Sequence, residues 1–340
     1  KQWRWSVCGR GLVALAGAVA VAVAAPVSAQ TPRPAVTAGW QDGFFVGSDD
    51  GAYRLTLGTV LQADGRFDVN DPPATTGTFA LRKVRPVMAA RVARYFDMRL
   101  VPDFGGGTRV LQDAYVDARF SDALRVRVGK DKAPLGYELL IGDPFVLFTE
   151  RSLASSLVPN RDVGVQVLGD LKPGRVTYSA GVMNGVPDGT SSTTDVDSNG
   201  GKTLVGRVVV HPFTTKGKVL DGFGLHLGAS RGHEEGALPS FRTSIGQTWF
   251  SYDRTTTAAG LHTRVTPAAM YYVKAFGMFA EYVRSTQQVR RTSLVDVDNH
   301  GWDVTAAYVL TGEAVTERGV RPAHPFDPTA HQWGAVQGDR

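Results

Sequence analysis

The chain has 340 residues, of which 43% are hydrophobic, and it contains 37 Lys and Arg residues, 32 Asp and Glu residues and one cysteine. Three of the basic residues and none of the acidic ones lie in the first 29 positions, so the remainder carries 34 basic against 32 acidic residues. This near balance excludes a global basic excess as an argument for nucleic-acid binding. Any function of the basic residues therefore depends on where they cluster.

The first 29 residues have the pattern of a secretory signal peptide. A basic start is followed by an apolar run from Leu12 to Ala25, and small residues stand directly before Gln30. The run is shorter than the roughly 20 apolar residues that span a bilayer, which disfavours a membrane anchor. We expect cleavage before Gln30, export, and a segment 30–52 that leads into the folded part. Because Cys8 lies in the leader, the exported chain has no disulfide and no thiolate metal site.

Alternation with period two dominates residues 53–340. In the segment 110–120, apolar residues at 114, 116, 118 and 120 alternate with Asp113, Tyr115, Asp117 and Arg119. About fourteen such segments occur, each about ten residues long and bounded by Gly, Asp, Asn or Pro, which is typical of β-strands. After the leader no stretch reaches 18 apolar residues, so a transmembrane helix is excluded. The pattern predicts an all-β fold of antiparallel strands.

Two architectures accommodate this many alternating strands. In a soluble sandwich or barrel the apolar faces point inward, whereas in an outer-membrane barrel they meet lipid and the polar faces line a lumen. Strand length, the export signal and aromatic residues near strand ends favour the membrane barrel, although such rings also fit a soluble β-core. The alternative function is an exported soluble β-protein that binds a carbohydrate or polymer. The aromatic residues concerned are Tyr95, Phe96, Phe120, Phe213, Trp249, Phe250, Tyr271, Tyr272 and Trp302.

A resemblance to a known family is carried mainly by the segment 125–166. Its distinctive pieces are Gly129 to Glu138, Phe148 to Leu153 and Pro159 to Gln166. In order and spacing they resemble the phosphate-selective porin O and P family. Weaker matches extend the resemblance from about residue 53 to the end of the chain, and they lie at 81–85, 112–116, 180–185 and 310–313.

The resemblance implies a trimer of sixteen-stranded transmembrane β-barrels in the bacterial outer membrane. Each barrel of such a homotrimer has its own water-filled pore, through which anions such as phosphate diffuse passively. The segment 333–340 resembles the start of a further strand, and we interpret it to mean that one or two C-terminal strands are missing. A naturally smaller or non-functional barrel is the alternative. An even strand number is what bacterial barrels need for closure.

Basic residues recur on the polar faces of the predicted strands. A charge on the lipid face costs about 2–4 kcal/mol at mid-bilayer, so these faces are assigned to the lumen. Rings of cations make a path for anions, and guanidinium groups bind phosphate through paired hydrogen bonds. Alternatively, the cations pair with Asp97, Asp103, Asp113 and Asp117 on neighbouring strands and only satisfy a polar lumen. The strand cations assigned to the lumen are Lys83, Arg85, Arg91, Arg99, Arg125 and Arg127.

The segment 131–161 is a candidate constriction loop. Long connections without regular structure are uncommon unless they are functional. A loop that folds into the barrel places Lys130, Lys132, Arg151 and Arg161 at the narrowest point of the pore, where they would bind anions. Alternatively, the three prolines of this segment stiffen a loop at the surface.

The sequence gives no positive support for catalysis through a metal site or a phosphate-binding loop. The seven histidines are scattered without the HExxH spacing, and no P-loop sequence is present. The segment Asp195 to Gly200 begins like a calcium-binding loop but lacks its distal Glu and flanking helices. We therefore expect no enzymatic activity, no cofactor, no metal site and no nucleic-acid partner. The expected partners are small anionic solutes, outer-membrane lipid and further copies of the chain.

Overall fold

The computed structural model describes residues 35–41, 43–67, 77–107, 109–192, 201–213, 219–243, 247–323, 326–327, 329 and 332–333. The predicted signal peptide, residues 1–29, lies outside this part, as do the Asp195–Gly200 segment and residues 334–340. The part of the chain that the structure describes contains no helix long and apolar enough to cross a membrane.

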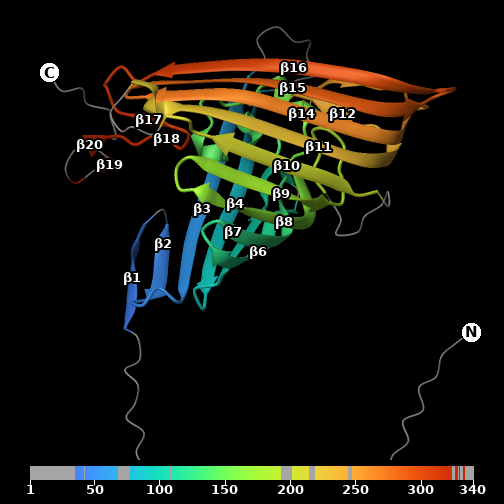
Figure 1. The fold of residues 1–340 in the computed structure, drawn as a ribbon. Helices are drawn as coiled ribbons and strands as arrows, with labels where there is room; N and C mark the ends of the chain where they lie inside the picture. Colours follow the sequence, from blue (N-terminus) through green and yellow to red (C-terminus); the bar gives the residue numbers. More distant parts are fainter. Residues whose placement is uncertain are drawn as a thin grey trace, which may run out of the picture. The chain divides into compact units, whose positions relative to one another are not determined.

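One antiparallel sheet of fourteen strands forms most of the described chain (Figure 1). The strands pair in chain order, and β1 and β16 each pair with one neighbour among the described residues, so the sheet is not closed there. The all-β antiparallel fold predicted from the alternation is confirmed. The strands are β1 (Val36–Trp40), β2 (Phe44–Ser48), β3 (Arg54–Arg66), β4 (Thr78–Val92), β5 (Phe96–Asp103), β6 (Val110–Ser121), β7 (Leu124–Lys132), β8 (Arg161–Lys172), β9 (Val176–Met183), β10 (Thr203–Val210), β11 (Phe223–Ala237), β14 (Thr257–Val273), β15 (Phe276–Arg290) and β16 (Leu294–Tyr308).

The other regular elements are short and lie in the connections. The hairpin of β12 and β13 interrupts the connection between β11 and β14, and two further hairpins follow β16. They comprise β12 (Ser240–Arg242), β13 (Thr248–Ser251), β17 (Val315–Thr316), β18 (Gly319–Val320), β19 (Phe326–Asp327), β20 (Gln332–Trp333), α1 (Tyr137–Leu140), and the 3₁₀ helices η1 (Gly105–Gly107), η2 (Asp143–Phe145), η3 (Leu153–Leu157) and η4 (Val219–Gly222).

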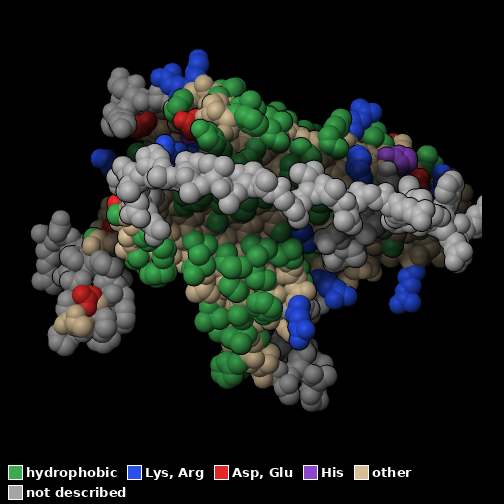
Figure 2. All heavy atoms as spheres, turned by 90° about the horizontal axis from the view of Figure 1, so that it is seen from below, with side chains coloured by type: hydrophobic (Ala, Val, Ile, Leu, Met, Phe, Trp, Pro, Cys, Tyr) green, Lys and Arg blue, Asp and Glu red, His purple; other side chains and the backbone are tan. Residues whose placement is uncertain are grey.

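The two faces of the sheet differ in polarity. On β5, Phe96, Met98 and Leu100 are exposed, whereas the alternate positions include Asp97 and the buried Asp103. Hydrophobic side chains form a broad patch on the face that Figure 2 shows, with Lys and Arg toward its margins. Exposed apolar side chains on one face and buried charges on the other invert the arrangement of a soluble sandwich, and they are typical of an outer-membrane barrel. We call these faces the outer and the inner face.

Strand register shows that the inner face is continuous. Arg91 of β4 stands opposite Asp97 of β5, which stands opposite Asp117 of β6. Asp117 in turn stands opposite Arg127 of β7 and Arg127 opposite Gln166 of β8. Two arginines therefore flank two aspartates along a row that crosses five neighbouring strands and ends on a neutral glutamine.

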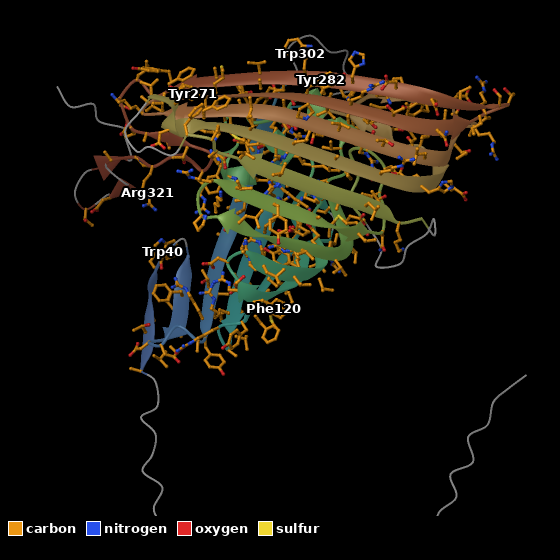
Figure 3. The ribbon with its side chains drawn as sticks, in the orientation of Figure 1. Trp40, Phe120, Tyr271, Tyr282, Trp302 and Arg321 are labelled. Atoms are coloured by element: carbon orange, nitrogen blue, oxygen red, sulfur yellow. The ribbon has the colours of Figure 1, made fainter. Side chains whose placement is uncertain are left out.

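Several aromatic residues differ from the expected position near strand ends. Trp302 lies in the middle of β16, opposite Tyr282, and both side chains point away from the sheet on its outer side (Figure 3). Tyr272 instead faces inward, where its hydroxyl meets that of Tyr137 at 3.0 Å. Trp249 belongs to β13 and packs on Phe241, outside the large sheet. The outward-facing rings still suit a lipid boundary, because an amphipathic ring has one apolar and one polar end.

Candidate pore lining and inner loop

Residues 133–160, between β7 and β8, cross the inner face and contact strands β15 and β16. Leu135 and Val158 from this connection form a buried apolar cluster with Val283 of β15. Farther along, a Cβ placed on Gly301 of β16 would lie 3.2 Å from the Cβ of Ala154, so the missing side chain lets η3 approach the strand. The apolar contacts anchor the connection to β15 and β16, and we call it the inner loop.

Hydrogen bonds fix the start of the inner loop to the same strands. The Glu281 carboxylate of β15 accepts the backbone N–H of Tyr137 at 2.5 Å and that of Glu138 at 3.0 Å. These are the first N–H groups of α1, which otherwise have no partner within the helix. The Tyr137 hydroxyl also donates to Glu317 at 3.0 Å. One buried carboxylate therefore orients the whole first turn of the loop.

Ion pairs bind the middle of the inner loop to β4, near the other end of the sheet. Asp143 contacts Arg85 of β4, lies 3.4 Å from Lys83 Nζ, and accepts a hydrogen bond from Arg151 at 2.7 Å. Three predicted site residues thus converge on one aspartate. Because the same loop binds the inner face at β4 and at β15, the sheet must curve around it, as Figure 1 shows.

Two of the carboxyl groups of the inner loop, Asp143 and Glu138, differ in acidity. Burial alone would raise the pKa of Asp143, but the charges of Arg151, Lys83 and Arg85 outweigh it and hold that pKa well below the ordinary value. Burial raises the pKa of Glu138, although Ser152 donates hydrogen bonds to its carboxylate from both its amide and its hydroxyl. Asp143 is therefore the permanently charged anchor of the loop.

A second pair of predicted site residues shares another aspartate. Arg161 Nε lies 2.7 Å from Asp113 Oδ1, and Arg99 Nε lies 3.5 Å from Asp113 Oδ2. Arg91 pairs with Asp97 at 2.8 Å across the β4–β5 turn. Lumen cations thus pair with aspartates of neighbouring strands, which is the alternative to a free path for anions. This pairing reduces the free positive charge of the inner face.

Arg127 is the most completely bound of the predicted strand cations. Two of its nitrogens donate to Asp117 at 2.7 and 2.8 Å, and the third contacts Asp131. Its guanidinium also lies 3.8 Å from the centre of the Tyr115 ring, in cation–π contact. A guanidinium held by two carboxylates and a ring is a structural element of the wall more than a free anion ligand.

The remaining predicted cations of the loop region support the backbone. Lys132 Nζ donates to the carbonyls of Leu139 at 2.5 Å and Ile141 at 3.1 Å. Lys130 is buried and donates to the carbonyl of Ser192, in the connection between β9 and β10. These contacts brace the loop against the ends of the strands.

Three arginines on one cross-strand row have side-chain atoms without a partner. Arg119 stands opposite Arg125, and the row continues through Leu168 and Ser179 to Arg207 of β10. The Nε atom of each arginine is buried and has no hydrogen-bond partner in the part of the chain that the structure describes. Arg119 also reaches Asp97 at 3.2 Å through Nη2. Among the described residues, Arg125 and Arg207 form no ion pair, so this row keeps positive charge.

The alternation did not single out Arg82, and a β-bulge explains why. Register shifts by one residue where Gln62 pairs with Lys83 and Ala63 with Leu81. The bulge re-aims Arg82, which binds Glu150 of the inner loop at 2.5 and 2.6 Å. The sequence signal for the bulge is the adjacent pair Arg82 and Lys83, because strict alternation would place one of these two charges in lipid. Arg207 was missed since Val205 and Val209 share its face.

A buried polar network lies between β11, β14 and β15. Arg264 Nε donates to Asp188 at 2.5 Å and Nη2 to Glu234 at 2.9 Å. His262 lies 2.7 Å from Ser285 Oγ and 3.0 Å from a Glu234 oxygen, distances that a catalytic triad also shows. However, Ser285 is completely buried and donates its proton to Asp188 at 2.5 Å. No substrate carbonyl reaches this hydroxyl, so the network is structural.

An apolar outer face, a charged inner face and a loop across the interior define the class of porins. The model of one family, described as phosphate-selective porin O and P, matches residues 56–338. The chain belongs to this family. The comparison with curated protein sequences gave no match.

The comparison with solved structures found similarity to OmpT, an outer membrane protein of Vibrio cholerae. Its in-vitro folded form is 11% identical, with a TM-score of 0.48, over 76% of this chain and 72% of that one. A mutant of it that lacks loop L8 is 12% identical, also with a TM-score of 0.48, over 76% and 78% of the two chains. A trimer form of OmpT is 10% identical with a TM-score of 0.36, over 81% and 85%. The family assignment rests on the sequence match alone.

Proposed function

We propose that the protein is an outer-membrane channel through which small anions, phosphate among them, diffuse passively. The observation that carries the anion preference is the row of Arg119, Arg125 and Arg207, whose Nε atoms have no partner among the described residues. Fixed cations replace part of the hydration that an anion loses on entering a narrow pore. The paired cations elsewhere on the inner face contribute less, because neighbouring carboxylates offset their charge.

The row has a geometry that suits oxyanions. Arg119 and Arg125 stand on adjacent strands, and side chains directly opposite each other lie about 5 Å apart. Two neighbouring guanidinium groups present several N–H donors, which can share the oxygens of one phosphate. A preference for phosphate over other anions is supported by the name of the family, and the described contacts support the anion class.

The inner loop is proposed to narrow the channel. Its ion pairs with β4 and its hydrogen bonds to β15 hold it across the lumen, so solutes pass beside it. The longer connections, such as 133–160 and 184–202, lie at the same end of the sheet, and long loops are extracellular in outer-membrane barrels. We also propose that residues 1–29 are cleaved as a signal peptide and that the chain assembles as a homotrimer.

The channel itself is tested on the exported chain. We expect it to be extracted from outer membranes only with detergent, to migrate differently on gels before and after heating, and to conduct ions in planar bilayers. A mature chain that is soluble without detergent would overturn the proposal, because its apolar outer face would then have to be covered in another way.

The anion preference is tested by reversal potentials in a KCl gradient. We expect the parent channel to favour chloride, and Arg125→Glu with Arg207→Glu to weaken or reverse this preference. Arg284→Glu is the matched control, since Arg284 lies on β15 and is exposed, paired with Asp298 at 2.8 Å. Cation preference in the parent would refute the anion assignment while leaving the channel intact.

A further inference from the structure

The inner loop carries a run of exposed apolar side chains between its charged anchors. Leu147 is 55% exposed and Phe148 is 60% exposed, and Phe145 is also exposed, as is Leu153 beyond the second anchor. On one side of this run Asp143 is bound to Arg85, and on the other the carbonyl of Thr149 accepts a hydrogen bond from Arg82 at 3.2 Å. The apolar side chains between these anchors are therefore held on the inner side of the sheet, where lipid does not reach.

The apolar run separates two cavities. On one side lies a cavity of about 320 Å³ whose walls include Tyr272 and Phe279. On the other side lies a cavity of about 690 Å³, next to Gln62 of β3. Leu147 and Phe148 line both cavities. A surface that lines both cavities is accessible from within the lumen.

The larger cavity combines apolar and cationic walls. Leu147, Phe148 and Leu153 form its apolar part. Its charged part has four basic and two acidic side chains, so cations are in excess, and they are Arg82, Lys83, Arg151, Arg242, Asp143 and Glu150. Arg242 of β12 is exposed and has no ion pair among the described residues. The volume lies within the range of sites for small organic molecules, which is about 300–1,000 Å³.

We infer that the larger cavity is a binding site for small amphipathic organic anions, such as an aromatic carboxylate, on their way through the channel. The apolar body lies against Leu147 and Phe148, and the carboxylate faces Arg242, which has no acidic partner among the described residues. Inorganic phosphate gains no binding free energy from the apolar wall, because it has no apolar surface to bury there. This inference rests on the proposed channel function and adds a second class of solute to it.

The test uses the full chain in planar bilayers, with phenylacetate as the probe and acetate as its small counterpart. Both are monovalent carboxylates, so they differ mainly in the apolar ring. We expect phenylacetate to interrupt the chloride current at concentrations at least about fivefold lower than acetate, since burying part of a ring contributes about 1 kcal/mol or more. Equal effects of the two carboxylates on a conducting channel would refute the inference and leave the proposed function standing. A chain that does not conduct would refute both.

Variants locate the site. The double substitution Leu147→Ser with Phe148→Ser should weaken the phenylacetate block by about fivefold, because it removes the apolar wall. Arg242→Gln should weaken it through loss of charge. Leu171→Ser is the control, since Leu171 is a similarly exposed residue near the β8–β9 turn, away from both cavities. A phenylacetate block that is unchanged in the double variant would overturn the assignment of the site.

Discussion

The carboxylate of Glu281 accepts the backbone N–H of Tyr137 at 2.5 Å, across 144 positions of the sequence. This contact joins β15 to the first turn of the inner loop, opposite the ion pairs that Asp143 makes with β4. The loop is thus attached at two walls by two different kinds of bond. Each attachment can be removed separately, and the consequences differ.

Removing the Glu281 attachment should release the start of the loop. Glu281→Ala leaves two buried N–H groups without an acceptor, which costs about 1–3 kcal/mol each and shifts the equilibrium between bound and released loop by about tenfold or more. We expect larger single-channel conductance and more current noise in bilayer recordings. Glu235→Ala, at an exposed position of β11, is the control. Conductance and noise equal to the parent would show that Glu281 does not hold the loop.

Removing the charge of Asp143 should instead change selectivity. Asp143→Asn leaves Lys83, Arg85 and Arg151 without their shared counter-ion. A unit charge several ångströms from a passing ion is worth about 0.5–1 kcal/mol in water. The ratio of anion to cation permeability should therefore rise by about twofold to fivefold in reversal-potential measurements.

The control for this change is Asp298→Asn, which removes the same charge from an exposed position of β16. It should leave the permeability ratio close to that of the parent. If Asp143→Asn lowers the ratio or has no more effect than Asp298→Asn, then Asp143 does not face the ion path.

The effect of Asp143 should persist in acid. Because its pKa is held well below the ordinary value of 3.8, its ion pairs are complete above that value and are lost only as the pH falls through the depressed pKa. At pH 3.5 an ordinary aspartate would be more than half protonated. We expect the selectivity difference between the parent and Asp143→Asn to be as large at pH 3.5 as at pH 7. A difference that disappears by pH 3.5 would indicate an ordinary carboxyl group.

Local sequence patterns predicted much of the sheet and part of the site. Alternation assigned Arg85 and Arg127 to the inner face because side-chain direction depends only on neighbouring residues in a strand. The pairing of Arg91 with Asp97 was also accessible, since a tight turn brings these two positions together. Side-chain direction within a strand and pairing across a tight turn could therefore be predicted from the sequence, because both depend only on residues close together in the chain.

Other features of the site depend on distant contacts. The contact of the re-aimed Arg82 with the inner loop and the docking of Tyr137 on Glu281 both join segments far apart in the chain. The charge of the inner face could not be derived from counts of basic residues, because Asp113 serves both Arg99 and Arg161. Arg207 has no acidic partner among the described residues, and this depends on the pairing of several strands, which no local pattern encodes.

The buried network around Arg264 should contribute strongly to the stability of the sheet. Arg264 is 1% exposed, and Arg264→Ala would remove the arginine counter-charge that Asp188 and Glu234 share in the buried network. Breaking a buried pair in this way costs about 3–5 kcal/mol, so the temperature at which the folded gel band converts to the unfolded one should fall markedly. Arg284→Ala removes an arginine that is 56% exposed from a pair of similar length with Asp298, and exposed pairs contribute little. Equal shifts of the two conversion temperatures, measured in the same detergent, would show that burial does not decide the strength of these pairs.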